Sequence, residues 1–485
     1  MEKVLSCHDV AEIDRTVVTK IGVPEAVLIE NAAREFIGIL SVSKSSIIQI
    51  ICGKGNNGAD GYAIGRHLVN DGYSAVTCIQ VSKELGAQCL FERNLAVSYG
   101  VRVVSIDDFI RGKGLVIDAL YGTGFHPPMD EDGMAVIRML SGHPNVISVD
   151  VPSGLSDQTP LDSLSVQARF TVTFGAMKSC LLSPYASRRV SDGTVPAVRN
   201  PGFPRKLIDD ACGDFQLIEQ EDASLETLDP TAYKNQRGHV AFFGGCESQC
   251  GAAILSGLSA FNARAGLVTI LLSPNSQRFF DYPQLMMGKY SDDLSLFDAI
   301  GLGNGLDIND ADAPSLVQRV LEADRPTVLD SGALRVLDQV KFPERTAPLV
   351  MTPHLGELKS VLQCDNLKLL STVEYLALLR RKAAEYGAVI VAKSNVTWVV
   401  GPEGRVNALW GNLSQLGVAG SGDVLCGIIA AFLAQGMSAF DAAVNGVLVH
   451  FHAGKAAKAQ NGWFDSLLLT SLVGKAVDDL SEDSR

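Results

Sequence analysis

Two glycine-rich stretches, one in each half of the chain, constrain its fold most strongly. The first, Gly53–Gly61, lies between a β-like run, Ile47–Ile51, and a helix-like run, Tyr62–Val69. A glycine-rich turn between a strand and a helix allows backbone N–H groups and the helix N-terminus to receive a phosphate. The second, Gly417–Asp423, ends in an aspartate and leads into the apolar run Val424–Phe432. Because the two stretches cannot belong to one site, we expect two catalytic domains.

The length and composition agree with two domains. At 485 residues the chain exceeds what one hydrophobic core usually organises, and 47% of its residues are hydrophobic, so that both halves can bury a core. The regular pattern is lost between about Asn200 and Pro230, where prolines and the acidic stretch Glu219–Asp222 occur. We place a linker there and predict domains over residues 1–215 and 220–485.

Charge and cysteine usage exclude several classes of partner. A formal net charge of −13 without a Lys/Arg cluster argues against nucleic acid. The ten cysteines show no C-x-x-C spacing, so that neither a zinc site nor a disulfide scaffold is indicated. The N-terminus is charged from the start, and the longest apolar run, Val424–Ala434, is too short to span a bilayer. We therefore expect a soluble, cytoplasmic protein without a membrane partner, assembled as a homo-oligomer.

Short β-like segments alternate with helical patterns through both halves, as is typical of βαβ units in a parallel sheet. Two helical stretches, Val10–Thr19 and Glu25–Leu40, precede the first of them. The first half contains Ile47–Ile51, Ala75–Val81, Val101–Val104, Leu115–Ala119, Val146–Val149 and Phe170–Phe174. The second half contains Val240–Phe243, Leu267–Leu272, Ala299–Leu302, Thr327–Leu329, Leu349–Met351 and Val389–Val391. The pattern predicts two different α/β domains, the first of them Rossmann-like and doubly wound.

Three polar clusters follow β-like segments of the first half: Asn56–Asp60, Asp118–Gly124 and Asp150–Gly154. Ligands of a doubly wound sheet bind outside the carboxyl ends of its strands, so we expect these clusters to converge on one crevice. Their amide, carboxylate and hydroxyl oxygens suit a hard cation. Each cluster alone could be an ordinary glycine-rich turn. Three at successive strand ends favour a site.

The second half has its own constellation around Gly417–Asp423. Three further polar segments follow β-like runs: Gly301–Gly305, Thr352–Glu357 and Lys393–Thr397. Backbone amides at a helix start can hold a transferring phosphoryl group, and the adjacent Asp423 can serve as a base. The other interpretation of the loop is a flexible connection before a core helix, and the companion segments argue against it.

The motifs of the first half resemble those of NAD(P)H-hydrate epimerases over about residues 1–210. In Gly55–Gly61 the family's usual Gly-Gly-Asp reads Gly58-Ala59-Asp60. The resemblance implies a potassium ion held by Asn57, Asp118 and Ser153. It also implies that the hydrated nicotinamide nucleotide is bound by Asn56, Asn57, Gly58, Ala59, Asp60, Gly122, Thr123, Gly124, Phe125, His126, Pro127, Pro128 and Asp150.

The second half resembles the ADP-dependent NAD(P)H-hydrate dehydratases, which have a ribokinase-like fold, over about residues 225–480. Tyr233–Val240 and Gly251–Ala253 belong to the same resemblance. It implies that the hydrate lies near Ala252, Gly305, His354 and Asp423. It also implies that ADP phosphates are bound by Lys393, Ser394, Asn395, Val396, Thr397, Gly420, Ser421 and Gly422.

The second half departs from its family at two places. The usual His-Pro-Gly-Glu reads His354-Leu355-Gly356-Glu357, and Gly332 stands where the second acid of Asp-Ala-Asp is usual. Mg²⁺ is expected in this domain, and Gly332 leaves open whether a carboxylate there could hold it.

Together the two resemblances imply a bifunctional repair enzyme for NADH hydrate and NADPH hydrate, both isomerase and lyase. The C6 of the hydrate is a carbinolamine carbon, so that the ring nitrogen can expel water and water can return on the other face. Asp150 would be the acid/base of this epimerisation. Asp423 would activate the C6 hydroxyl of the S form to attack the terminal phosphate of ADP, giving NAD(P)H, AMP and phosphate.

Two alternatives stay open at this point. The C-terminal domain could be a kinase for a hydroxymethyl- or hydroxyethyl-substituted heterocycle, in which case the product would be a stable phosphate ester. The N-terminal domain could be a non-catalytic nucleotide- or protein-binding module. The intact Asn56-Asn57 pair and Asp150 argue against the second alternative.

Overall fold

The computed structural model describes residues 1–485 apart from 214, 228, 246–248, 273–281 and 483–485. The chain divides into two compact units. The N-terminal unit comprises Glu2–Gln216 and Lys368–Tyr375, and the C-terminal unit comprises Met1, Leu217–Leu367 and Leu376–Arg485. Each unit is described below by itself.

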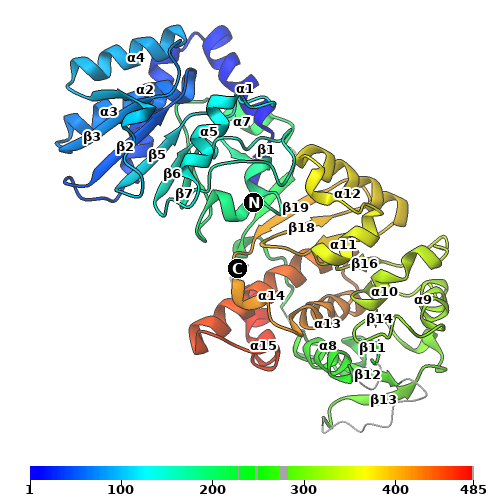
Figure 1. The fold of residues 1–485 in the computed structure, drawn as a ribbon. Coiled ribbons are helices and arrows are strands. Elements are labelled where there is room, and N and C mark those ends of the chain that lie inside the picture. The colour runs from blue at the N-terminus through cyan, green and yellow to red at the C-terminus, as the bar shows by residue number, and fades with distance from the viewer. Residues whose placement is uncertain (214, 228, 246–248, 273–281, 483–485) are drawn as a thin grey trace. The chain divides into compact units, whose positions relative to one another are not determined.

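The N-terminal unit contains a parallel sheet of seven strands in the order β4-β3-β2-β5-β6-β7-β9 (Figure 1). The strands are β2 (Ile47–Cys52), β3 (Ala75–Gln80), β4 (Arg102–Ser105), β5 (Leu115–Ala119), β6 (Val146–Val149), β7 (Phe170–Phe174) and β9 (Ala197–Arg199). The chain runs outward from β2 to β4 and then returns to the other side of β2 with β5. This reversal confirms the doubly wound prediction and creates a topological switch point between β2 and β5.

Helices cover both faces of this sheet. The helices of eight or more residues are α1 (Cys7–Thr16), α2 (Glu25–Gly38), α3 (Asn56–Asn70), α4 (Ala87–Ser98) and α5 (Glu131–Leu140). Successive side chains of β2 point to opposite faces, as the period of a strand requires. Ile50 packs with Phe36 of α2 and Tyr62 of α3, whereas Ile51 packs with Val136 of α5. Shorter elements are β1 (Glu2–Leu5), β8 (Met177–Lys178), α6 (Ser187–Val190) and α7 (Arg205–Asp210), and β10 (Phe215–Ile218) lies at the boundary of the units.

The segment Lys368–Tyr375 belongs to the N-terminal unit although it lies far along the chain. The Leu161 N–H donates to the Leu370 carbonyl at 2.7 Å. The Val373 N–H donates to the Asp157 carbonyl at 3.2 Å. The sequence analysis places this segment in the second domain, because nothing local marks a pairing with a partner so distant in sequence.

The C-terminal unit contains nine consecutive strands in the order β13-β12-β11-β14-β15-β16-β17-β18-β19. They are β11 (His239–Phe243), β12 (Leu267–Leu272), β13 (Met286–Lys289), β14 (Ala299–Leu302), β15 (Thr327–Leu329), β16 (Leu349–Met351), β17 (Val389–Ala392), β18 (Val396–Val400) and β19 (Val406–Trp410). The pairs are parallel as far as β17, and β18 and β19 add an antiparallel hairpin. The hairpin was not predicted from the sequence, and its strand β18 begins with Val396 and Thr397, the last two residues of the predicted phosphate-binding segment.

The helices of this unit are α8 (Cys250–Asn262), α9 (Ala313–Glu322), α10 (Gly332–Arg335), α11 (Leu355–Leu362), α13 (Ser421–Ala434), α14 (Ala439–Asn461), α15 (Ser466–Glu482) and, from Leu376 on, α12 (Thr372–Tyr386). The largest core cluster joins Ile428 of α13, Val447 of α14 and Ala260 of α8 to sheet residues such as Val268 and Val328. Across the described residues, the helices are too short or too polar to cross a membrane.

We expect a fragment of residues 1–216 to fold but to unfold earlier than the same unit in the full chain. Its core clusters are internal, but it lacks the three backbone hydrogen bonds that join residues 157–162 to Lys368–Tyr375. At about 1 kcal/mol for each bond, the midpoint of thermal unfolding should fall by about 9 °C. Circular dichroism of the fragments 1–216 and 217–485 and of the full chain measures this. Failure of both fragments to fold would place the boundary elsewhere.

Candidate active sites

The polar stretch after β2 is the first turn of a helix. Helix α3 begins at Asn56 with Gly55 at its N-cap, whereas the sequence pattern predicts a helix only from Tyr62. A Cβ at Gly58 would lie 2.1 Å from the Gly53 carbonyl oxygen. Glycine is therefore required here for the close approach of the helix to the strand end, and not for a flexible loop. The helix N-terminus, which favours anions, faces the end of the sheet.

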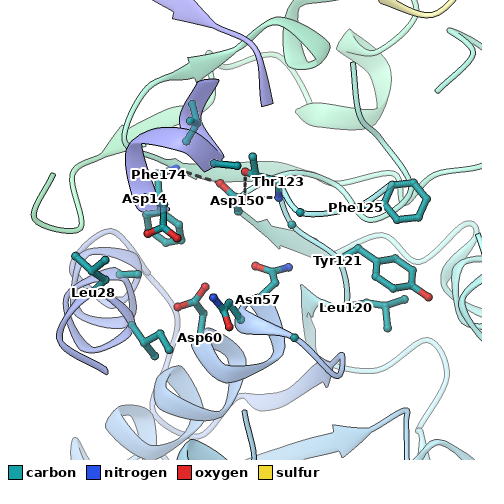
Figure 2. Close-up of a pocket in the computed structure, with 18 of the residues that line it drawn as sticks. Asp14, Leu28, Asn57, Asp60, Leu120, Tyr121, Thr123, Phe125, Asp150 and Phe174 are labelled. Atoms are coloured by element: carbon teal, nitrogen blue, oxygen red, sulfur yellow. Dashed lines mark hydrogen bonds between the residues drawn. The ribbon is translucent and has the colours of Figure 1, made fainter. Parts of the chain in front are cut away.

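A cavity of about 640 Å³ opens at the switch point between β2 and β5 (Figure 2). The three polar clusters predicted from the sequence all reach it. From the predicted substrate-binding set, its lining contains Asn56, Asn57, Asp60, Gly122, Thr123, Gly124, Phe125, His126, Pro128 and Asp150. Gly58 and Ala59 are buried in α3, and neither they nor Pro127 belong to the described lining.

Helices α1 and α2 supply a wall of this cavity that the sequence analysis did not assign. Asp14 of α1 and Glu25 of α2 bring two further carboxyl groups. Leu28, Phe174 and Phe203 make the same cavity partly apolar. A planar ring can bury its faces against such side chains while its polar substituents meet carboxylates.

The groups around Asp150 favour its ionised form. It follows β6 in the left-handed region, with φ at 70°. The Thr123 N–H and hydroxyl donate to it, the former at 2.7 Å, and Lys178 Nζ lies 2.7 Å from its Oδ1. Lys178 is fully buried and also donates to Thr173 and Phe174. Burial by itself raises the pKa of Asp150, but Lys178 and Thr123 lower it below its usual range.

The residues predicted to hold a cation are buried at the same strand ends. The Ser153 hydroxyl donates to Asp118 Oδ1 at 2.6 Å and its N–H to Oδ2 at 2.9 Å, and the Ser148 hydroxyl adds a bond of 2.8 Å. Burial nevertheless raises the pKa of Asp118. The Asn57 side chain is buried, and its amide nitrogen and oxygen have no hydrogen-bond partner among the described residues. An unpaired amide oxygen and a buried carboxylate are the donor set of a hard cation.

A separate group of buried side chains has the donor atoms of a softer metal. The ligand atoms of Cys7, Asp157 and Cys180 lie within 4.8 Å of one another. The two sulfurs are 3.6 Å apart, and the Cys7 N–H donates to the Asp157 carboxylate. The contact with Cys180 and burial raise the pKa of the Cys7 thiol. The sequence spacing gives no sign of this group because its members come from distant segments.

In the C-terminal unit, the ends of four neighbouring strands bring polar groups to the start of α13. Asp423 in the first turn of α13 accepts a hydrogen bond of 2.6 Å from Asn304 Nδ2, which also donates to Asp330 at 3.1 Å. Asp330 is buried and accepts from Lys393 Nζ at 2.9 Å and from the Thr352 hydroxyl at 2.8 Å. The structure thus joins Asp423 to Lys393 through Asn304 and Asp330, two residues that the sequence analysis assigned no role.

Burial and neighbouring charges together determine the pKa values of Asp423 and Lys393. Burial, with help from Asp330 and Glu357, raises the pKa of Asp423 to about 6, although Asn304 and Lys393 oppose the shift. Burial alone would lower the pKa of Lys393, but attraction by Asp330 outweighs it and raises the pKa. The site therefore combines a fixed cation with a carboxylate that changes charge near neutral pH.

The predicted phosphate loop lies against the ammonium group of Lys393. Gly420 has φ at 88°, which glycine favours, and it is the N-cap of α13. A Cβ at Gly422 would lie 3.1 Å from Lys393 Nζ, so that the loop and the lysine are in contact. The Ser421 hydroxyl lies 3.0 Å from Nε2 of the partly buried His450, which no sequence motif indicated. Burial lowers the pKa of His450 to about 4, so the ring is neutral.

His354 has a structural partner of its own. It is the N-cap of α11, where its Nδ1 accepts from the N–H groups of Gly356 at 2.8 Å and Glu357 at 3.2 Å. The Glu357 carboxylate in turn accepts from the His354 N–H at 3.0 Å. This reciprocal cap accounts for the position of His354, whose side chain is half exposed, and a role toward substrate stays a prediction.

Three other predicted positions can be located. Ala252 lies in the first turn of α8, and Gly305 follows β14 with φ at 75°. A Cβ at Gly332 would lie 2.7 Å from the Leu306 carbonyl oxygen. The close backbone contact explains why a side chain is absent where the related families carry a second acid.

Comparisons with known proteins agree on both halves. Residues 25–180 match the family model described as the YjeF-related protein N-terminus, and residues 240–476 match that of NAD(P)H-hydrate dehydratase. The bifunctional NAD(P)H-hydrate repair enzyme Nnr of Moorella thermoacetica is 30% identical, over 94% of this chain and 93% of its own. The enzyme of the same name from Escherichia coli K12 is 30% identical, over 85% of this chain and 81% of its own.

Among solved structures, the ADP/ATP-dependent NAD(P)H-hydrate dehydratase of Bacillus subtilis is 25% identical, with a TM-score of 0.45, over 55% of this chain and 96% of its own. The yeast protein ynu0 is 24% identical, with a TM-score of 0.37, over 43% of this chain and 92% of its own.

Proposed function

This chain belongs to the family of bifunctional NAD(P)H-hydrate repair enzymes, and from that premise we propose how its two sites divide the reaction. Such an enzyme interconverts the R and S forms of NAD(P)H hydrate and dehydrates the S form with ADP, releasing AMP and phosphate. We assign the isomerase activity to the cavity of the N-terminal unit and the lyase activity to the start of α13 in the C-terminal unit.

In the N-terminal cavity, Asp150 is the group that we place beside C6 of the hydrate. The ring nitrogen expels the C6 hydroxyl as water and leaves an iminium carbon, to which water adds on either face. The ionised Asp150, held by Lys178 and Thr123, stabilises this cation and accepts the proton of the returning water. Leu28, Phe174 and the N-terminus of α3 are suited to the ring and the phosphates.

We propose that Asn57, Asp118 and Ser153 hold a potassium ion in this unit. The proposal is supported, among the described residues, by the unpaired Asn57 amide, by the burial of Asp118 without a hydrogen bond from a positively charged group, and by the oxygen-only donor set. The ion would supply a fixed positive charge next to the cavity. It would compensate Asp118 and anchor the loop from Leu120 to Gly124.

In the C-terminal unit, the chain of contacts from Asp423 to Lys393 carries the assignment. Asp423 removes the proton of the C6 hydroxyl, whose oxygen attacks the terminal phosphorus of ADP while AMP leaves. The C–O bond to phosphate then breaks as the lone pair of the ring nitrogen forms a C=N bond, and loss of a proton from C5 to the released phosphate gives the C5=C6 bond of NAD(P)H. Lys393 and the N–H groups of Gly420–Gly422 are placed to stabilise the transferring phosphoryl group.

We also propose Mg²⁺ as the metal that accompanies ADP in this unit. When bound, it would neutralise phosphate charge. The buried carboxylate of Asp330 already accepts hydrogen bonds from Lys393, Asn304 and Thr352. The neighbouring backbone leaves no room for a side chain at Gly332. The ion would therefore be held mainly by the phosphates themselves.

One experiment tests the complete assignment. Purified protein is incubated with a mixture of R and S hydrates and ADP, and the recovered absorbance of the dihydronicotinamide is followed. Both activities together convert the whole mixture, whereas a dehydratase alone leaves the R form. Accumulation of a stable phosphate ester without NAD(P)H would instead indicate a small-molecule kinase.

The dehydration rate should rise with pH through about 6. Asp423 must be ionised to act as a base, and its pKa is raised to about 6, so activity is lost as pH falls through that value. The rate at saturating ADP and S hydrate, measured between about pH 5 and 8, gives the profile. A rate that is constant across this range would assign the base to another group.

A further inference from the structure

Asp150 has no proton to give at neutral pH. Lys178 and the Phe174 N–H occupy its Oδ1 at 2.7 and 3.4 Å, and Thr123 donates twice to its Oδ2. All of these donors stabilise the ionised carboxylate. Expulsion of a hydroxyl group from a carbinolamine carbon needs a proton on the leaving oxygen. If the proposed epimerisation is correct, a second group in the cavity must supply that proton.

Asp14 and Asp60 are the candidates. Figure 2 shows both carboxylates with that of Asp150 at the same cavity, Asp14 on α1 and Asp60 in the second turn of α3. Both side chains are only partly buried, so they remain open to a ligand. Among the described residues, none donates a hydrogen bond to either carboxylate. Asp14 and Asp60 therefore lack the donors that keep Asp150 ionised.

Four other carboxyl groups act on Asp60. Burial, together with the negative charges of Asp150, Asp14 of α1, Glu92 of α4 and Glu25 of α2, raises the pKa of Asp60 well above its usual range. Burial, Glu25 and Asp150 raise the pKa of Asp14 to about 6.

The cations near the cavity are largely engaged elsewhere. Arg66 lies 2.5 Å from Glu30, and Lys178 pairs with Asp150. Lys54 also lines the cavity, and its charge acts on Asp130. Asp60 is thus left in a carboxyl cluster that favours its neutral form.

We propose that Asp60 is the general acid of epimerisation, that Asp14 is a positioning residue which keeps Asp60 protonated, and that Asp150 is the base on the other side of the ring. The proposal rests on the proposed function. Asp60 gives its proton to the C6 hydroxyl, the C–O bond breaks with its electrons going to oxygen, and the nitrogen lone pair forms the C=N bond. Water then adds to the opposite face and gives a proton to Asp150. Solvent in the open cavity returns that proton to Asp60.

The test is the pH profile of epimerisation by the full-length protein. Wild type, Asp60→Asn, Asp60→Glu and Asp14→Asn are given R hydrate without ADP, and the S form is measured by chromatography after subtraction of the uncatalysed rate. Because the acid must be protonated, the wild-type rate should fall as pH rises through the pKa of Asp60. Asp60→Asn should lower the rate by about 10²-fold and abolish this alkaline decline, and Asp60→Glu should restore part of both.

Asp14→Asn should move the alkaline decline to lower pH, because it removes a negative neighbour of Asp60. A residue needed only for folding would not shift the profile. Asp71→Asn, at the exposed far end of α3, is the matched control and should match wild type. A wild-type profile in Asp60→Asn would overturn the role of Asp60, and an unmoved decline in Asp14→Asn would overturn that of Asp14. Absence of epimerisation by wild type would instead contradict the proposed function.

Discussion

Asp423→Asn should reduce dehydration of the S hydrate by about 10²-fold or more, the usual scale for a positioned base. The substitution keeps the size of the side chain and one acceptor for the Asn304 amide, which lies 2.6 Å away. It removes the proton acceptor at the start of α13. The rate is measured from the recovered absorbance of NADH at saturating ADP.

Three controls separate this result from a loss of fold. ADP binding, measured by calorimetry, should survive, because Lys393 and the Gly420–Gly422 amides remain. Epimerisation should be unchanged, because its groups lie in the other unit. Asp441→Asn, in the exposed first turn of α14, removes an acid from an equivalent helical position and should leave dehydration intact. Near-normal dehydration by Asp423→Asn would rule out the phosphoryl-transfer mechanism.

Many strands could be predicted because buried parallel strands are short apolar runs. Leu115–Ala119, Phe170–Phe174 and Leu349–Met351 are strands with the predicted bounds. The hairpin of β18 and β19 was missed, because Val396–Val400 begins within a polar segment interpreted as binding phosphate. The pairing of Lys368–Tyr375 with the N-terminal unit was missed because it depends on tertiary structure alone.

The residues of the candidate sites also divide into those with a local sequence signal and those whose contacts depend on tertiary structure. Asp150, which directly follows β6, and Asp423, in the first turn of α13, were singled out from local sequence patterns, and Asp150 lines the cavity where the strands of the parallel sheet end. Asn304 and Asp330 lie at strand ends too, but their role depends on contacts across three strands that no spacing encodes. Asp14 had no signal at all, because it lies in an ordinary amphipathic helix that precedes the sheet.

The polar groups at strand ends also bear on the ions proposed for the two units. In the N-terminal unit, the donors that described residues offer to the buried Asp118 carboxylate are hydroxyl and amide groups, which carry no positive charge. In the C-terminal unit, the buried Asp330 already has Lys393 as its counter-ion. A monovalent cation at Asp118 would therefore complete the first site in the way that a lysine completes the second.

Asp118→Asn should abolish the response of the N-terminal unit to potassium and reduce epimerisation by about 10-fold or more, the scale on which loss of a local charge partner acts. In wild type, potassium at 100 times its dissociation constant should stabilise this unit by about 2.7 kcal/mol relative to a large organic cation at the same ionic strength. The variant keeps the shape of the side chain and its contacts with Ser148 and Ser153, but it removes the charge that attracts the ion. The measurement is the midpoint of thermal unfolding in each salt, with epimerisation followed in parallel.

Asp192→Asn is the matched control, because Asp192 is exposed and its side chain pairs only with Arg169 at the surface. It should retain both the potassium response and epimerisation. If wild type unfolds at the same temperature in potassium and in the organic cation, the buried charge of Asp118 has no ion as its partner. Asp118→Asn would then unfold at the same temperature in both salts as well, and the proposed potassium site would be wrong.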